Sequence, residues 1–96
     1  MDRFQNKVIL IAGGSRGIGA AVARRFSSLG GEVAIGYRTH RNAADALVSD
    51  IEAFGGVAKA FESDISRANS VEALVQNVIA HFGRIDVLVN CAAVAP

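Results

Sequence analysis

The fold is decided by one stretch near the start of the chain, Lys7-Val8-Ile9-Leu10-Ile11-Ala12-Gly13-Gly14-Ser15-Arg16-Gly17-Ile18-Gly19. After its lysine, the run Lys7–Ala12 is apolar without alternation, which is typical of a strand buried on both faces of a sheet. The glycines that follow allow positive φ and let a helix or a ligand approach the backbone closely. Because a helical pattern starts directly after them, the stretch predicts a strand, a tight turn and a helix.

Strand and helix patterns alternate outward from this stretch. Further runs rich in β-branched residues follow at Glu32–Tyr37, Val57–Glu62 and Asp86–Asn90. The segments between the strands carry apolar residues three or four positions apart, which is the spacing of one helix face. Each segment ends in glycine, as expected where a left-handed residue closes a helix, at Gly30-Gly31, Gly55-Gly56 and Gly83. The pattern predicts an α/β fold with a doubly wound, parallel, Rossmann-like sheet.

Composition narrows the classes of function. The chain has 96 residues and a formal net charge of +1, so we expect one small domain without the basic field that nucleic acid or a membrane surface needs. No apolar run approaches the roughly 18 residues of a spanning helix. A single cysteine forms no internal disulfide and fits a reducing cytoplasm, and His40, His81 and Cys91 are too scattered for a metal site. We therefore expect a cytoplasmic protein with no nucleic-acid partner, no membrane segment and no metal.

The glycine turn is a candidate phosphate site. Free N–H groups and the helix dipole at the start of a helix favour an anion. The spacing is Gly-x-x-x-Gly-x-Gly, from Gly13 to Gly19, rather than the Gly-x-Gly-x-x-Gly of the better-known dinucleotide fingerprint. A P-loop is excluded because no Gly-Lys-Ser/Thr follows. The alternative is a glycine-rich turn between strand and helix that holds no ligand.

The end of the second strand indicates which nucleotide would bind. An NAD or S-adenosylmethionine site usually places an acid about 20 residues beyond the glycines, where it accepts the ribose hydroxyls. Here Tyr37 is followed by Arg38, and the next acid, Asp45, falls inside the second helical segment. An arginine suits a 2′-phosphate, and Arg16 could reach the same phosphate from the turn. Two cations without an acid predict NADP(H), with NAD(H) less favoured; the alternative for Arg38 is a solvated surface cation.

At these residues the sequence resembles the N-terminal part of the short-chain dehydrogenase/reductase family, nearest its 3-oxoacyl-(acyl-carrier-protein) reductase-like branch. The family motif Thr-Gly-x-x-x-Gly-x-Gly is matched from Gly13 to Gly19, with Ala12 in place of the threonine. The resemblance implies four strands in the order 3-2-1-4 with three helices, incomplete at the C-terminal side. Residues 1–96 would then be the N-terminal dinucleotide-binding part of a single Rossmann-fold domain.

The resemblance also implies contacts beyond the glycine turn. Asp64, with Ile65 beside it, would accept a hydrogen bond from the adenine amino group, and Asn90 would begin the family's Asn-Asn-Ala-Gly turn, which here reads Asn-Cys-Ala-Ala. From the residues alone, Asp64 is equally a helix cap, a position for which Ser66 competes, and the alternative for Asn90 is a turn former. The expected cofactor-binding set is Gly13, Ser15, Arg16, Gly17, Ile18, Gly19, Tyr37, Arg38, Asp64, Ile65, Asn90 and Ala92.

Catalytic residues are not expected in this chain. The family uses a Ser and a Tyr with a Lys four residues later, whereas Tyr37 is the only tyrosine here and is followed at that spacing by Arg41. One hypothesis is therefore the NADP(H)-binding part of an enzyme that interconverts a carbonyl and an alcohol by hydride transfer. That full-length protein would act on a small carbonyl or alcohol substrate and form a homo-oligomer. The other is an inactive nucleotide-binding or interaction module, or a non-functional truncation.

The last predicted strand also bears on the mean hydropathy of +0.32. In the order 3-2-1-4 this strand lies at the edge of the four-stranded sheet, and its apolar Val87-Leu88-Val89 run would be open on one side. We expect an apolar sheet edge prone to pairing or aggregation.

Overall fold

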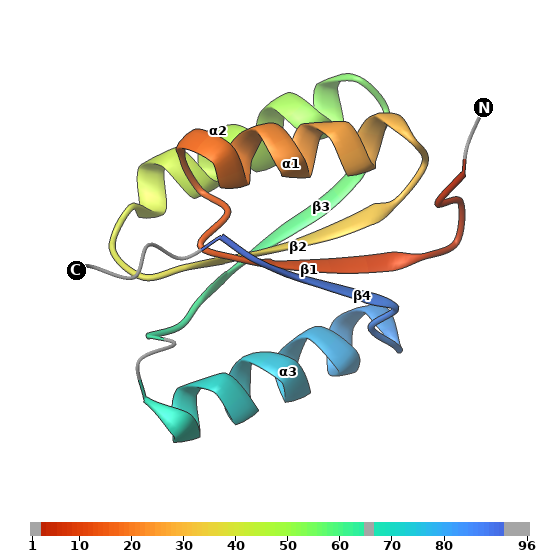
Figure 1. The fold of residues 1–96 in the computed structure, drawn as a ribbon. Helices are drawn as coiled ribbons and strands as arrows, with labels where there is room; N and C mark the ends of the chain where they lie inside the picture. Colours follow the sequence, from red (N-terminus) through yellow and green to blue (C-terminus); the bar gives the residue numbers. More distant parts are fainter. Residues whose placement is uncertain (1–2, 65–66, 92–96) are drawn as a thin grey trace.

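Strands and helices alternate along the chain in the computed structural model, which describes residues 3–64 and 67–91 (Figure 1). The four strands are parallel and lie in the order β3-β2-β1-β4. The predicted α/β class and the order 3-2-1-4 are confirmed. In chain order the elements are β1 (Val8–Ala12), α1 (Gly17–Ser28), β2 (Glu32–Tyr37), α2 (Arg41–Ala53), β3 (Val57–Glu62), α3 (Ala68–Phe82) and β4 (Val87–Asn90).

The sheet is covered on both faces, with α1 and α2 on one side and α3 on the other (Figure 1). Successive side chains of a strand point to opposite faces, so β1 contributes to two cores. Ile9 and Ile11 belong to the cluster that includes residues of α1 and α2, whereas Val8 and Leu10 pack with residues of α3. All four are at most 2% exposed. This double burial is the reason that β1 is apolar throughout.

Glycines end the helices as predicted. Gly30 and Gly55 have φ values of 90° and 86°, and the N–H groups of the next residues return to carbonyls inside α1 and α2, with Gly31 bound to Phe26 and Gly56 to Ile51 at 3.0 Å each. These are the backbone bonds of a Schellman motif. They turn the chain sharply from each helix into the next strand.

The first and last strands start one residue later than the sequence patterns predict. Lys7 donates its N–H to Phe4 O at 2.9 Å rather than to a neighbouring strand, so β1 begins at Val8. At β4, the Val8 N–H donates to the Asp86 carboxylate, with Oδ2 at 2.8 Å. If β4 extended farther toward its N-terminus, a backbone carbonyl of β4 would accept this hydrogen bond instead. These two hydrogen bonds, one within the N-terminal turn and one between β1 and the start of β4, define the strand boundaries.

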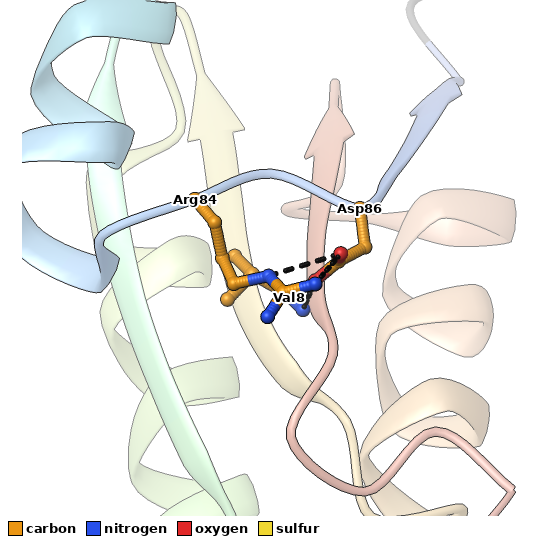
Figure 2. A network of polar contacts seen from close by, with 3 residues as sticks. All are labelled: Val8, Arg84 and Asp86. Carbon is orange, nitrogen blue, oxygen red and sulfur yellow. Dashed lines mark hydrogen bonds and ion pairs between the residues drawn. The ribbon is translucent and has the colours of Figure 1, made fainter.

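Asp86 anchors β4 to β1 at both its backbone and its side chain. Its N–H donates to Val8 O at 2.8 Å, and Arg84 Nε donates to its Oδ1 at 3.0 Å. Figure 2 shows the Asp86 carboxylate joined by dashed lines to the Val8 backbone and to the Arg84 guanidinium. The hydrogen bond from the Val8 backbone and then that from the Arg84 side chain lower the pKa of Asp86 from its ordinary value of 3.8. The charged form of Asp86 is therefore favoured in the folded chain, where its carboxylate ties the start of β4 to Val8 of β1.

The outer side of β4 leaves apolar surface exposed. Val87 and Val89 pack against the core cluster that contains Ile9, so alternation places Leu88 on the opposite face, where it is 64% exposed. β4 is an edge strand of the described sheet, and the tendency of this edge to pair or aggregate stays a prediction.

Replacing Asp86 with asparagine tests the β4 anchor. Because the pKa of Asp86 is lowered in the folded chain, its contribution to stability is present above the unfolded value and is lost as the pH falls through the folded value. We expect Asp86→Asn to lower the free energy of unfolding at pH 7. The difference from the unsubstituted chain should shrink in acid, as measured by urea unfolding between pH 7 and pH 2.

Asp45→Asn is the matched control, since that exposed carboxylate pairs only loosely with Arg41, at 3.9 Å. It should change stability little at any pH. A stability difference for Asp86→Asn that stays constant from neutral pH into acid would contradict the anchoring role of the charge.

Candidate functional site

Those residues proposed from the sequence that the structure describes lie toward one edge of the sheet. All strands are parallel, so their carboxyl ends share an edge, and Ala12 at the end of β1 pairs with Gly36 of β2 and with Asn90 of β4. The chain winds from β1 toward one edge through α1 and reaches β4 on the other side through α3. In open α/β sheets, such a reversal opens a crevice at the carboxyl ends of the strands, where ligands bind.

The turn between β1 and α1 presents a helix N-terminus to this edge. Gly13 and Gly14 donate their N–H groups to Gly36 O, at 2.8 and 3.2 Å, which ties the turn to β2. The first α-helical bond in α1 runs from Ala20 N to Arg16 O. The three N–H groups before it, those of residues 17–19, have no acceptor within the helix because of helix geometry. The first turn of α1 carries no acid, so the partial positive charge of the helix N-terminus is not neutralised there and favours an anion.

Gly17 and Gly19 are required for different reasons. Gly17 has a φ of 58° and no atom within 4 Å of the position a Cβ would take, so its conformation alone favours glycine. A Cβ on Gly19 would lie 2.4 Å from Gly13 O and 2.6 Å from Gly14 Cα. Only a glycine lets α1 sit this close to the turn. Helix and turn are therefore held together at the place where the N–H groups are presented.

The glycine turn also carries the exposed side chains named from the sequence. Arg16, the N-cap residue of α1, makes no side-chain capping bond and is exposed, Ile18 is 78% exposed, and Ser15 is half-buried. Asn90, at the end of β4, is exposed across the sheet edge from Ala12. All four lie at the carboxyl edge of the sheet.

Arg38 and Asp64 meet at the same edge. Arg38 directly follows β2, its side chain is 71% exposed, and its Nε lies 3.8 Å from Asp64 Oδ2. The Tyr37 side chain points away from solvent and is only 6% exposed, within the core cluster beneath α1 and α2. A contact between Tyr37 and a ligand would therefore involve its backbone or the ring edge. The remaining expected residues, Ile65 and Ala92, lie outside the described residues.

Ser63 supports this corner of the site and was not singled out from the sequence. It is 8% exposed, donates its N–H to Tyr37 O at 2.7 Å and donates its Oγ–H to Ser70 O at 3.1 Å. Because a lone serine after a strand has no distinctive pattern, only the strand register reveals this role. The N-cap of α3 is Arg67, so the alternative of Asp64 as the N-cap is wrong: the helix begins farther along the chain.

A large groove lies at the opposite edge of the sheet. Its volume is about 870 Å³, and its lining comes from the ends of α1 and α2 and the starts of β2 and β3, including Arg24, Asp50, Phe54 and Glu32. Arg24 and Asp50 pair across it at 3.1 Å. Helix C-termini, which repel anions, face this groove. The chemistry of a phosphate ligand favours the edge with the glycine turn over this groove.

Two further features concern metals and membranes. Within residues 3–64 and 67–91, His, Cys, Asp and Glu form no group of three or more that could hold a metal ion. Over the same residues, every helix is too short or too polar to cross a bilayer. Cys91 is half-buried against the core cluster beneath α1 and α2.

Parallel strands wound in this order, with a glycine turn and a helix N-terminus at the reversal point, define a Rossmann-type fold. The family model described as short chain dehydrogenase matches residues 7–96. The chain therefore belongs to the short-chain dehydrogenase/reductase family, whose members are oxidoreductases.

Its relatives include reductases of the branch expected from the sequence. A 3-oxoacyl-[acyl-carrier-protein] reductase from Synechocystis is 41% identical over 94 residues, which cover 98% of this chain and 38% of that protein. Hydroxynaphthalene reductase arp2 from Aspergillus fumigatus is 40% identical over 87 residues, or 91% of this chain and 32% of that one. The chain thus spans about two fifths or less of the length of these relatives.

Solved structures agree with the fold. A short chain dehydrogenase from Burkholderia cenocepacia, in complex with NADP, matches with a TM-score of 0.91 and 43% identity over 96% of this chain and 38% of that one. A short-chain dehydrogenase/reductase from Serratia marcescens matches with a TM-score of 0.91 and 40% identity over 95% and 37%.

Substituting Gly19 tests the contact between α1 and the turn. Gly19→Ala forces backbone apart at Gly13 and Gly14, so we expect a loss of about 1–3 kcal/mol in the free energy of unfolding. Amide exchange at Gly13 and Gly14 should also accelerate as their bonds to Gly36 O lengthen.

Gly17→Ala is the comparison, because it introduces only left-handed strain, of about 1–2 kcal/mol, into open space. It should leave exchange at Gly13 and Gly14 close to that of the unsubstituted chain. Equal exchange rates in the Gly19→Ala and Gly17→Ala variants would show that helix packing does not hold the turn.

Proposed function

We propose that this chain is the NADP(H)-binding part of an oxidoreductase that interconverts a carbonyl and an alcohol by hydride transfer. The observation that carries the proposal is Arg38, exposed directly after β2, where an NAD site usually has an acid. The Burkholderia relative holds NADP, and a related blue fluorescent protein from a metagenomic library holds NADPH. These relatives support the choice of a phosphorylated cofactor.

The residues at the carboxyl edge fit such a cofactor. The cradle in which a Cβ on Gly19 would collide brings the N-terminal N–H groups of α1 close to the turn, where they would bind the pyrophosphate. Arg38 and Arg16 would hold the 2′-phosphate, and Asp64 would accept from the adenine amino group with Ile65 beside it. The other proposed contacts are Gly13, Ser15, Gly17, Ile18, Tyr37, Asn90 and Ala92.

The contribution of these residues to the reaction is binding and orientation. When bound, NADPH supplies the hydride and the protein supplies position and electrostatics. No residue of this chain is assigned to proton transfer, since Tyr37 is largely buried and Arg41 stands where a lysine would be needed. A small carbonyl or alcohol substrate, a homo-oligomeric full-length protein and a cytoplasmic location belong to the same proposal.

Removing the Arg38 side chain tests the choice of cofactor. A charge-assisted hydrogen bond contributes about 1.5–3 kcal/mol, so Arg38→Ala should weaken NADPH binding roughly 10- to 100-fold and leave NADH binding nearly unchanged. Calorimetric titration with both cofactors measures this difference.

Arg24→Ala is the control, because Arg24 is a half-exposed arginine at the opposite edge of the sheet. It should alter neither affinity. Equal losses for NADPH and NADH in Arg38→Ala would contradict the 2′-phosphate assignment.

The division between binding and chemistry predicts the behaviour of the 96-residue chain in an assay. It should bind NADPH without reducing carbonyl compounds, because it contains no Tyr-x-x-x-Lys. The measurement is NADPH absorbance with a panel of ketones and aldehydes, beside a binding titration on the same sample. Reproducible reduction by purified protein would mean that a catalytic group lies among these residues.

A further inference from the structure

Arg38 directly follows the paired end of β2, and Asp64 follows the paired end of β3 after one residue, Ser63. Tyr37 pairs with Glu62 at the ends of β2 and β3, and Ser63 N then donates to Tyr37 O at 2.7 Å. The backbone is thus tied together immediately before Arg38 and Asp64. The meeting of these two side chains follows from the sheet itself.

The contact between the two side chains is ionic and open to replacement. Its length of 3.8 Å exceeds a hydrogen bond, and the Arg38 side chain is 71% exposed whereas that of Asp64 is 32% exposed. The carboxylate sits on the better-buried partner, next to the anchored Ser63, and the guanidinium is the partner free to turn. An incoming anion would therefore draw Arg38 away from Asp64.

A ligand phosphate and the Asp64 carboxylate are anions that require the same guanidinium. When the ligand has a 2′-phosphate, Arg38 must leave Asp64 or share its charge between the two. When the ligand lacks that phosphate, Arg38 keeps its ion pair with Asp64, so no unpaired positive charge lies beside the ribose. The Asp64 carboxylate thus weakens binding of the ligand that carries the 2′-phosphate, and it lets the ligand without that phosphate bind beside a neutralised Arg38.

We propose that Asp64 lowers the preference of this site for a 2′-phosphorylated cofactor by competing with the 2′-phosphate for Arg38. This inference rests on the proposed NADP(H) function and adds a positioning residue to it. The competition concerns the Asp64 Oδ2 contact with Arg38 Nε, and the role proposed for Asp64 at the adenine is a separate part of the proposed function. Selectivity is then lower than Arg38 alone would give.

The test uses two ligands that differ only in the 2′-phosphate, adenosine 2′,5′-bisphosphate and 5′-AMP. Calorimetry gives the ratio of their affinities for the unsubstituted chain, Asp64→Asn, Arg38→Ala and the double variant. Because exposed ion pairs contribute little, we expect Asp64→Asn to raise the preference for the bisphosphate about 2- to 5-fold. A loss of stability or of adenine binding lowers the affinity for both ligands alike, so it does not change the ratio of the two affinities.

The double variant shows whether Asp64 changes the affinity ratio through Arg38. Asp64→Asn should leave the ratio unchanged once Arg38→Ala is present, since the competition no longer exists. Glu62→Gln removes an exposed charge from the end of the same strand and should leave the ratio near that of the unsubstituted chain.

Two results would overturn the inference: an unchanged ratio in Asp64→Asn, or an equal rise with and without Arg38, which would mean that the carboxylate repels the phosphate directly. If Arg38→Ala itself leaves the ratio unchanged, the NADP(H) assignment fails instead. The failures of the two proposals are therefore distinguishable.

Discussion

The close approach of α1 to the turn after β1 is the constraint on which the site depends. A side chain at Gly19 would collide with the backbone of Gly13 and Gly14, so helix and strand meet here without any intervening side chain. The same turn is tied to β2 through Gly36 O. The N-terminus of α1, the end of β2 and the end of β1 are thereby fixed relative to one another. A phosphate site needs that fixed geometry, because backbone N–H groups cannot adjust as side chains do.

The features predicted from the sequence are those that local patterns encode. An uninterrupted apolar strand requires cover on both faces, and β1 has it. Glycine after each helical stripe requires a left-handed residue, and Gly30, Gly55 and Gly83 all have positive φ. The gathering of the described site residues also follows, because parallel strands bring their carboxyl ends to one edge.

The features that were missed depend on contacts between distant parts of the chain. Asp86 reads as the first residue of a strand, yet its carboxylate binds the Val8 backbone 78 positions away. Tyr37 ends a strand beside the predicted site, but the strand register turns its ring into the core. Arg38 and Asp64 were each assigned to a ligand, and their contact with one another appears only when β2 and β3 are paired. Residue type and spacing carry no register, so none of these contacts could be derived from them.

The two edges of the sheet differ in charge because the helices all run in one direction relative to the strands. At the carboxyl edge, α1 begins with free N–H groups and without acids, and Arg16 and Arg38 extend into solvent. At the amino edge, α1 and α2 end in carbonyl groups, beside a groove of about 870 Å³. The direction of winding thus gives one edge of the sheet a backbone charge that favours anions, independently of the side chains there. In the proposed function, Arg38 would add a preference for a further phosphate, and Asp64 would moderate it.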